Sequence, residues 1–418
     1  MDARPRLGKL YRASAFLGLQ QSIIGLLSMV ILVGMGERMA ERFLPIYVMA
    51  LGGTASIVGL LNGLDNLLSA LYSFPGGYLS ERLGTKRALL VFNLLAMVGF
   101  VIVILIPTWP AVIAGSFFFL SWTAISLPAT MSLVAKVLPK NRRTMGVSMH
   151  SLVRRIPMAL GPLAGGWFVD TWGDKDGVRL AFVAALAMAI LAIVLQQHLI
   201  EDDLGKSDNE GGARVPKNPL AVAKRMSPHL KNLLVSDVLI RFCEQIPYAF
   251  VVIWCMKSIA SPVSGEEFGV LTSIEMATAV LCYIPVAYFA DRAGKKPFVV
   301  VTFIFFTLFP LFLLWCQSFW ILVPAFILRG LKEFGEPTRK ALIMDLAPDD
   351  AKAAMFGVYY LIRDSIVSLA AFGGGLIWAY VSPTANLLTA FAFGVIGTVW
   401  FAWRGHDVST TETDPALG

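Results

Sequence analysis

Ionisable side chains stand inside long apolar stretches of this chain, where residue type and spacing can support proton chemistry. In the stretch ERMAERF, Glu37 and Glu41 are four residues apart, so a helix would place both on one face. Arg38 and Arg42 would form the adjacent stripe. Two carboxyl groups on one face compete for ionisation, which lets one of them load and release a proton near neutral pH. The alternatives are a structural network in which the arginines keep both acids charged, and a position of Glu41 at the outer helix end.

A second set of charges repeats this pattern later in the chain. The spacing of Arg38 and Glu41 returns as Arg241 and Glu244. One further apolar segment holds six charged residues, which are Arg329, Lys332, Glu333, Glu336, Arg339 and Lys340. Acidic and basic groups together suit a charged or zwitterionic small molecule better than a neutral sugar.

The composition places these charges in a membrane. The chain has 418 residues, of which 56% are apolar and 15% charged, whereas charged residues make up about 25% of soluble proteins. A spanning helix needs about 20 mostly apolar residues. Twelve segments meet this condition, which predicts an all-α polytopic membrane protein with twelve transmembrane helices. They are 22–49, 56–80, 87–106, 110–137, 144–170, 178–198, 233–258, 266–290, 296–316, 319–346, 353–380 and 384–403.

Lysine and arginine predict how these helices are oriented. They crowd the N-terminus and the loops on one side, which are 82–87, 140–143, 201–232 and 295–296. By the positive-inside rule both termini are cytoplasmic, and the net charge of +7 is a topology signal rather than a sign of nucleic-acid binding. The four cysteines look like packing residues, without metal-ligand spacing. The chain contains no Asn-x-Ser/Thr sequon, and its basic start lacks a small-residue cleavage site, which fits an uncleaved protein of a prokaryotic inner membrane.

An internal repeat divides the chain into two halves. Residues 77–87, GYLSERLGTKR, recur at an offset of 210 residues as 287–297, AYFADRAGKKP. A parallel repeat of this length is typical of secondary transporters. We therefore predict an N-terminal half at 1–200, a cytoplasmic linker at 201–232 and a C-terminal half at 233–418. The end of the linker is either an amphipathic surface helix or a disordered tether.

The repeated loop resembles the motif G-x-L-a-D-r-x-G-r-K of the major facilitator superfamily. The first copy has Glu81 in place of the usual aspartate, and the second has Ala287 in place of the first glycine. The resemblance covers nearly the whole chain and implies the fold of that family, with two pseudo-symmetric six-helix halves. The residues that carry it are Gly77, Glu81, Arg82, Gly84 and Lys86 in the first copy, and Asp291, Arg292, Gly294 and Lys296 in the second.

A second resemblance lies in the segment 144–170. Gly161, Pro162, Gly165 and Gly166 are similar to the end of the G-P-x-x-G-G motif of the family's proton-linked antiporters, although Pro157 replaces an expected upstream glycine. This resemblance implies a proton-coupled antiporter that exports its solute. The alternative is that these small residues simply let two helices pack closely.

The family fold implies roles for the charged residues. Segments 56–80 and 353–380 should pack together, as should 144–170 and 266–290, across the boundary between the halves. Asp65 with Arg363, and Glu275 with Arg154 or Arg155, would then form ion pairs that act as gates or, alternatively, as permanent links. We expect proton coupling by Glu37, Glu41, Glu244 and Glu336, and solute binding by Arg38, Arg241, Lys332 and Glu333.

The function predicted from these residues is proton-coupled transport of a small organic solute by alternating access, with export favoured. Uptake of an organic anion or a small peptide is the alternative, since the arginines suit an anion and ERMAERF is also similar to the E-x-x-E-R-F pattern of proton-coupled peptide transporters, from which it departs by one extra residue between the two glutamates. A sensor or scaffold without transport is the alternative from another class. We expect no enzymatic activity, cofactor, metal or nucleic-acid partner. We expect the protein to be a monomer whose transport is driven by the proton gradient.

Overall fold

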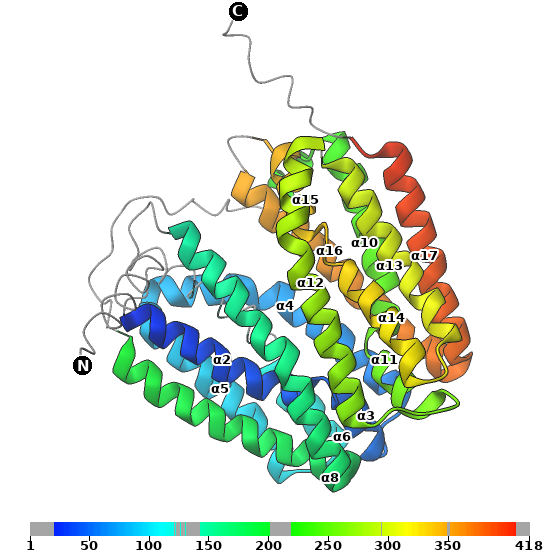
Figure 1. The fold of residues 1–418 in the computed structure, drawn as a ribbon. Helices are drawn as coiled ribbons and strands as arrows, with labels where there is room; N and C mark the ends of the chain where they lie inside the picture. The colour runs from blue at the N-terminus through cyan, green and yellow to red at the C-terminus, as the bar shows by residue number, and fades with distance from the viewer. Residues whose placement is uncertain are drawn as a thin grey trace, which may run out of the picture. The chain divides into compact units, whose positions relative to one another are not determined.

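The computed structural model describes residues 21–120, 122, 126, 130, 143–200, 219–293, 295–348 and 352–406. Within this part of the chain every regular element is a helix (Figure 1). The predicted all-helical fold is confirmed, because long apolar stretches can satisfy their backbone groups in a membrane only as helices or closed barrels.

The chain forms two compact units, and each is described separately. Unit 1 comprises residues 1–52 and 71–208, and unit 2 comprises 53–70 and 209–418. The first part of α4, which belongs to the predicted N-terminal half, groups with unit 2, and the later border between the units falls inside the predicted linker, at 208/209.

Unit 1 is built from long helices joined by short breaks. They are α2 (Gln21–Glu41), α3 (Leu44–Ala50), the later part of α4 (Ala55–Leu83), α5 (Thr85–Leu105), α6 (Trp109–Phe119) and α8 (Arg143–Leu199). Gly173 interrupts α8 with a φ of 81°, so this element consists of two helices, as the separate segments 144–170 and 178–198 predict.

Unit 2 contains the beginning of α4 and the elements after the linker. These are α9 (Pro219–Lys224), α10 (Pro228–Tyr248), α11 (Val251–Ile253), the π-helix η2 (Trp254–Ser258), α12 (Gly265–Ala293), α13 (Lys296–Trp315), α14 (Phe319–Leu331), α15 (Glu336–Leu346), α16 (Lys352–Tyr380) and α17 (Pro383–Arg404). Helix α9 lies in the part of the predicted linker that mixes apolar and basic residues.

The predicted spans 22–49 and 319–346 were wrong as single helices. The first is divided between α2 and α3, where Pro45 stands in the first turn of α3, and the second between α14 and α15, where Gly335 precedes the first turn of α15. Proline suits a helix start because it has no backbone N–H to donate. Partly because of such breaks, the described residues contain five helices, or six if one bent pair counts as a span, that are long and apolar enough to cross a membrane.

The bent pair is formed by α10 and the segment 251–258, which meet at 42°. At this break the N–H of Phe250 donates to the carbonyl of Pro247 at 2.8 Å, one residue short of the helical pattern. The carbonyl of Ile246 instead accepts a hydrogen bond from the side-chain amide of Asn386 on α17, at 3.2 Å. The same amide donates to the carbonyl of Gly374 on α16, at 2.8 Å.

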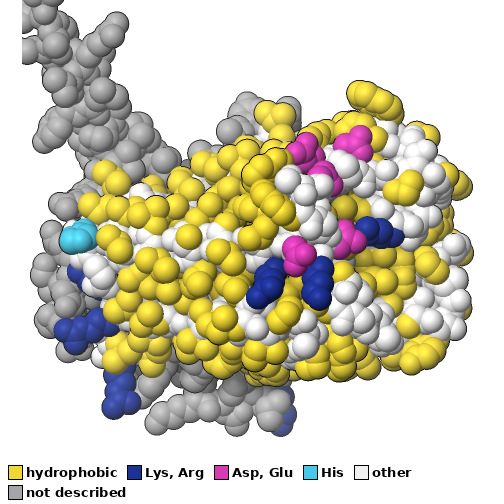
Figure 2. Space-filling view, turned by 90° about the horizontal axis from the view of Figure 1, so that it is seen from below, with side chains coloured by type: hydrophobic (Ala, Val, Ile, Leu, Met, Phe, Trp, Pro, Cys, Tyr) yellow, Lys and Arg dark blue, Asp and Glu magenta, His cyan; other side chains and the backbone are white. Residues whose placement is uncertain are grey.

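Hydrophobic side chains cover most of the described surface in the view of Figure 2. Large apolar residues are widely exposed, among them Leu105, Leu281, Trp320 and Leu369. Such a surface is unfavourable in water and suits contact with lipid.

The glycine of the first loop motif has a defined structural task. Gly84 separates α4 from α5 with a φ of 79°, a left-handed conformation that favours glycine. Lys86 follows in the first turn of α5, where its ammonium group donates to the carbonyl of Gln197 at 2.9 Å. The side chains of Glu81, Asp291 and Arg292 and the surroundings of Gly77 lie outside what the structure describes, as does residue Gly294, so the latching role of the two loops stays a prediction.

The glycines of the second motif bring α8 close to α2. A Cβ atom added to Gly161 would lie 2.6 Å from the Cβ of Arg38, and one added to Gly165 would lie 2.2 Å from the carbonyl oxygen of Met39. Close packing is therefore an established role of these two glycines, and it holds the helix that carries Glu37 and Arg38. The export role implied by the motif stays a prediction.

We expect Gly165→Ala to destabilise the protein by about 1–3 kcal/mol, because the added methyl group would push α8 away from the backbone of α2. Gly373→Ala on α16 is the matched control, since a Cβ atom at that position meets nothing within 4 Å. Thermal unfolding of the two purified variants in detergent tests this difference. Equal unfolding temperatures would contradict the packing role.

Candidate functional site

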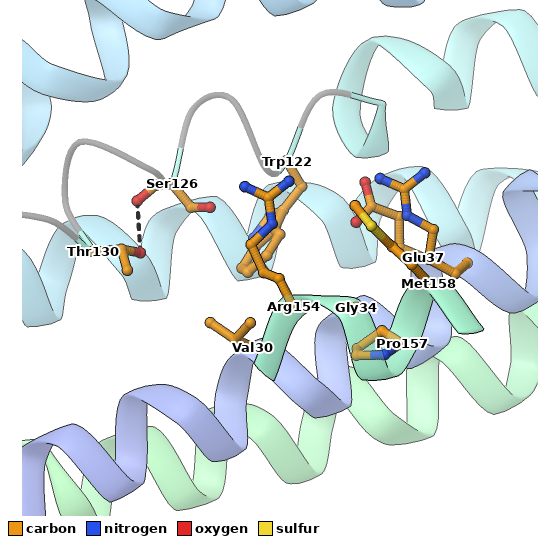
Figure 3. A pocket seen from close by; sticks show the side chains of 10 residues that line it. Val30, Gly34, Glu37, Trp122, Ser126, Thr130, Arg154, Pro157 and Met158 are labelled. Atoms are coloured by element: carbon orange, nitrogen blue, oxygen red, sulfur yellow. Dashed lines mark hydrogen bonds between the residues drawn. The ribbon is translucent and has the colours of Figure 1, made fainter. Parts of the chain in front are cut away.

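A pocket in unit 1 gathers several of the residues singled out in the sequence. Helix α2 contributes Glu37 and Arg38, and α8 contributes Arg154. The rest of its lining consists of Val30, Gly34, Trp122, Ser126, Thr130, Pro157 and Met158. We call this the unit-1 pocket (Figure 3).

Helical spacing explains why these residues share one pocket. Gly34, Glu37 and Arg38 follow Val30 by four, seven and eight residues, so they line one stripe of α2. Trp122, Ser126 and Thr130 are each four residues apart, and the Thr130 hydroxyl donates to the carbonyl of Ser126 at 2.9 Å.

The charges of the unit-1 pocket include both signs. Glu37 is buried, with 8% of its surface exposed. Arg38 forms an ion pair with Glu41 at 3.0 Å. Glu41 itself is not part of the pocket lining, but it contacts Arg38, which is. Figure 3 draws no hydrogen bond between Arg154 and the other residues of the pocket. Arg155 is adjacent to Arg154 in sequence but is not part of the lining.

A buried hydrogen-bond relay fixes the indole ring of Trp122. Its N–H donates to the side-chain oxygen of Asn93 at 2.9 Å. The amide of Asn93 donates to Gln196 at 2.8 Å, and the amide of Gln196 donates to the backbone carbonyl of Lys86 at 2.8 Å. Both amides are almost completely buried. Their hydrogen bonds fix the orientation of the Trp122 ring, which lines the pocket.

Unit 2 has a second charged pocket. Its lining includes Glu244 of α10 and Arg329 and Lys332 of α14 and its C-terminal end, together with Cys243, Tyr248, Val251, Phe306 and Phe309. The ammonium group of Lys332 lies 2.6 Å from Glu244 and 3.8 Å from Glu275 of α12. Glu275 also pairs with Arg329 at 3.3 Å. Lys332 is therefore shared between the buried Glu275 and Glu244, whose side chain is 9% exposed.

The ion pairs continue from this pocket through unit 2. Arg241 pairs with Glu244 and lies 3.8 Å from Glu336. Glu336 pairs with Arg339, which pairs in turn with Asp237.

The series ends on α16. Asp237 lies 3.4 Å from Arg363, which pairs with Asp364 at 2.7 Å. Positive and negative groups thus alternate along one connected series, which we call the ion-pair chain. Its members are Arg329, Glu275, Lys332, Glu244, Arg241, Glu336, Arg339, Asp237, Arg363 and Asp364.

Asp237 is the member that sequence reasoning missed. Its carboxylate is fully buried, contacts two arginines and accepts a hydrogen bond from the Tyr359 hydroxyl at 3.0 Å. A signal was present, because Asp237, Arg241 and Glu244 are spaced four and three residues apart and so lie on one stripe of α10.

The other predicted site residues are partly placed. The expected contact between segments 56–80 and 353–380 is present, since a Cβ atom on Gly59 of α4 would lie 2.6 Å from the Cα of Gly375 on α16. Asp65 is on this part of α4, but its pairing with Arg363 stays a prediction. The pairing of Glu275 with Arg154 or Arg155 also stays a prediction. Glu275 belongs to unit 2 and the two arginines belong to unit 1, and the units are described separately. Glu333 is half-buried at the C-terminal end of α14.

No group of three or more His, Cys, Asp or Glu side chains that could hold a metal ion occurs among the described residues. Apolar helices that enclose charged pockets are the architecture of a membrane transport protein, in which buried charges mark solute and ion pathways.

The model of the Major Facilitator Superfamily matches residues 26–261 and 238–417, so the chain belongs to this superfamily of multi-pass membrane transporters. The all-helical fold and the family predicted from the loop motifs are thereby confirmed.

Individual relatives share modest sequence identity with the chain. It is 29% identical over 153 residues to the uncharacterised transporter YfkF of Bacillus subtilis, a match that spans 36% of this chain and 38% of the relative. It is 22% identical to the multi-drug resistance efflux pump PmrA homolog of Lactococcus lactis over 88% of this chain and 91% of the relative. Among solved structures, the nucleoside transporter NupG superposes with a TM-score of 0.78 at 12% identity, covering 91% of this chain and 99% of its own.

We expect Asp237→Asn to destabilise unit 2 strongly, by about 3–5 kcal/mol, because it leaves two buried arginines without their shared carboxylate. Asp364→Asn is the matched control, because it removes a carboxylate from the same Arg363 at a position where 22% of the side chain is exposed. Chemical or thermal unfolding of the purified variants measures the difference. A loss for Asp237→Asn no larger than for Asp364→Asn would contradict the central place of Asp237.

Proposed function

We propose that this protein is a proton-coupled secondary transporter that exports a small organic solute in exchange for protons. The observation that carries the proposal is that each unit holds an acid, with no more than 9% of its surface or side chain exposed, beside basic groups in a pocket. Glu37 occupies this position with Arg38 and Arg154, and Glu244 with Lys332. The solute would be reached from alternate sides of the membrane as the two halves of the chain change their relative orientation.

The geometry around Lys332 supports coupling to protons. If Glu244 takes up a proton, its pairing with Lys332 weakens, and Lys332 can move toward Glu275, which is already 3.8 Å away. A proton thereby changes which helices are joined, because Glu244 is on α10 and Glu275 on α12. Exchange of ion-pair partners of this kind converts proton binding into a change of helix packing.

The direction of transport is supported by the similarity to a protein named as an efflux pump, and by the partial match of Gly161 to Gly166 with the end of the antiporter motif. We further propose that the protein resides in a prokaryotic inner membrane as a monomer, with both termini in the cytoplasm, as the distribution of lysine and arginine favours.

Proteoliposomes that contain a fluorescent pH indicator test this function with one probe of each charge class. Tetraphenylphosphonium, benzoate, L-tryptophan and myo-inositol are added outside vesicles that carry an imposed pH gradient. We expect at least one probe to move against a proton flux, and the sign of the pH change separates exchange from co-transport. The absence of both proton and solute movement across a wide panel of solutes would favour the sensor or scaffold alternative.

For a transported probe, we expect Glu244→Gln to reduce accumulation driven by the pH gradient by about tenfold, in the range of typical coupling energies. Exchange of labelled for unlabelled solute without a gradient should persist, because this exchange needs no net proton transfer. Asp345→Asn is the matched control, since Asp345 pairs with Lys295, the residue before α13, and neither residue lines a pocket. Undiminished accumulation in Glu244→Gln would exclude Glu244 from proton coupling.

A further inference from the structure

We propose that the charged pocket of unit 2, here called the unit-2 pocket, binds an uncharged solute that has a planar aromatic ring and a carbonyl group. The carbonyl oxygen accepts a hydrogen bond from Nη1 of Arg329. This inference rests on the proposed transport function and specifies the class of solute. It follows from a buried donor without a partner, from the pairing of the charges around it and from the rings that line the pocket.

The guanidinium group of Arg329 is buried with one nitrogen unused. Only 3% of the side chain is exposed, and its Nε lies 3.3 Å from Glu275. Nη1 has no hydrogen-bond partner among the residues that the structure describes. Because a buried donor without an acceptor is unfavourable, an acceptor that reaches Nη1 gains the desolvation penalty that this group otherwise carries.

The position of the unused nitrogen distinguishes Arg329 from two other arginines of unit 2. Arg241 and Arg339 each leave Nε without a partner in the described part of the chain. Their terminal nitrogens, however, are engaged by acids of the ion-pair chain, and neither residue lines the unit-2 pocket. Arg329 lines this pocket and its unused nitrogen is a terminal one, so we infer that a solute in the pocket can reach it.

The charged groups of the lining are already in ion pairs. Glu244 lies 2.6 Å from Lys332, and Arg329 pairs with Glu275. An ionised solute group would have to break one of these pairs or enter beside charges that have partners, which is costly in a buried site. A neutral oxygen can accept from Nη1 and leave both pairs intact. The proposal therefore departs from the charged or zwitterionic solute expected from the residue types alone.

Aromatic rings surround the guanidinium group of Arg329. The ring centres of Phe309, Phe326 and Tyr248 lie 5.1, 5.6 and 5.7 Å from its central carbon. Rings packed on a guanidinium group restrict its plane, and its N–H groups donate within that plane. Phe306, Phe309 and Tyr248 also line the pocket, where they offer apolar surfaces to a planar ring.

Glu275 connects this binding mode to the proposed proton coupling. Its Oε1 lies 3.3 Å from Nε of Arg329 and 3.8 Å from the ammonium group of Lys332. If protonation of Glu244 lets Lys332 move toward Glu275, the two bases share one oxygen atom more closely, and the position of Arg329 changes. Proton binding and solute binding therefore affect each other.

Binding to the purified protein, measured by equilibrium dialysis and thermal shift, tests the proposal with four probes of similar size. Benzamide has the ring and a neutral carbonyl oxygen. Benzoate is an anion, benzamidinium is a cation without an oxygen, and cyclohexanecarboxamide lacks the aromatic ring.

We expect benzamide to bind about tenfold or more tightly than benzoate and benzamidinium, which is the effect of one buried hydrogen bond to a charged group. Its advantage over cyclohexanecarboxamide should be about fivefold, in the range of aromatic contacts. Equal or tighter binding of any of the other three probes, or binding of none of the four, would overturn the proposal.

Arg329→Lys tests the hydrogen bond. This variant keeps a positive charge beside Glu275 but has no guanidinium nitrogens, so the preference for benzamide over benzamidinium should be lost. Arg404→Lys is the matched control, since it makes the same change at an exposed arginine whose guanidinium carbon lies 5.3 Å from the ring centre of Trp400. An unchanged preference in Arg329→Lys would refute the role of Nη1.

Phe309→Leu and Phe326→Leu test the aromatic contact and leave every ion pair in place. Both rings lie beside the guanidinium group, but only Phe309 lines the pocket. Phe309→Leu should lower the preference for benzamide over cyclohexanecarboxamide, whereas Phe326→Leu should keep it. The same preference in both variants would contradict the placement of the solute ring.

The flux measurements separate this proposal from the transport function on which it rests. Proton-coupled movement of tetraphenylphosphonium, benzoate, L-tryptophan or myo-inositol, without binding of benzamide, would overturn the carbonyl site and leave the transport function intact. Binding of benzamide with the expected preferences, but no flux of any solute, would overturn the transport function and leave the binding site standing.

Discussion

Charge balance inside an apolar body is the constraint on which the rest of unit 2 depends. A single ion moved from water into a low-dielectric interior loses several kcal/mol of solvation, which only close partners can offset. The ion-pair chain meets this condition with five acids and five bases in alternation. Since its members come from α10, α12, α14, α15 and α16 and the residues between α14 and α15, their mutual positions fix how these helices pack.

Alternation makes such a series responsive as well as stable. Each interior member has neighbours of opposite sign on both sides, so neutralising one acid frees two bases at once. Lys332 and Arg241 both contact Glu244 and each has a second acid within 3.8 Å. A single proton can therefore redistribute pairs over several helices, whereas an isolated ion pair would simply break.

Much of the fold could be predicted from the sequence, because the length of an apolar stretch and its polar breaks are local properties. The boundaries of α5, α13 and α17 follow directly from them. The breaks near Pro45 and Gly335 were missed, because the charged residues beside them, such as Arg42 and Glu333, were interpreted as site residues inside continuous spans and not as signs of a helix end. The sequence alone did not decide whether the small residues around Gly161 are an antiporter motif or simply let two helices pack closely. The close approach of α8 to α2 could therefore not be predicted with certainty from composition.

The site was predictable only in part. Arg38, Glu37 and Arg154 could be singled out by charge alone, but their meeting in one pocket depends on how α2 packs against α8. The importance of Asp237 depends on Arg339 and Arg363, which lie more than 100 residues away in sequence. The relay from Trp122 through Asn93 to Gln196 joins residues that are also distant in sequence and carry no charge to attract notice.

The amide of Asn386 has a mechanical consequence for unit 2. It occupies the carbonyl that the break in α10 leaves without its helical partner, and it binds the backbone of α16 at the same time. The hydrogen bonds of Asn386 therefore tie the break near Pro247 to two neighbouring helices. They hold the break in place, so it does not act as a hinge. The C-terminal end of α10, the later part of α16 and the first turn of α17 should therefore move as a single rigid piece, so we expect the pocket beside Glu244 to open by displacement of α12 and α14.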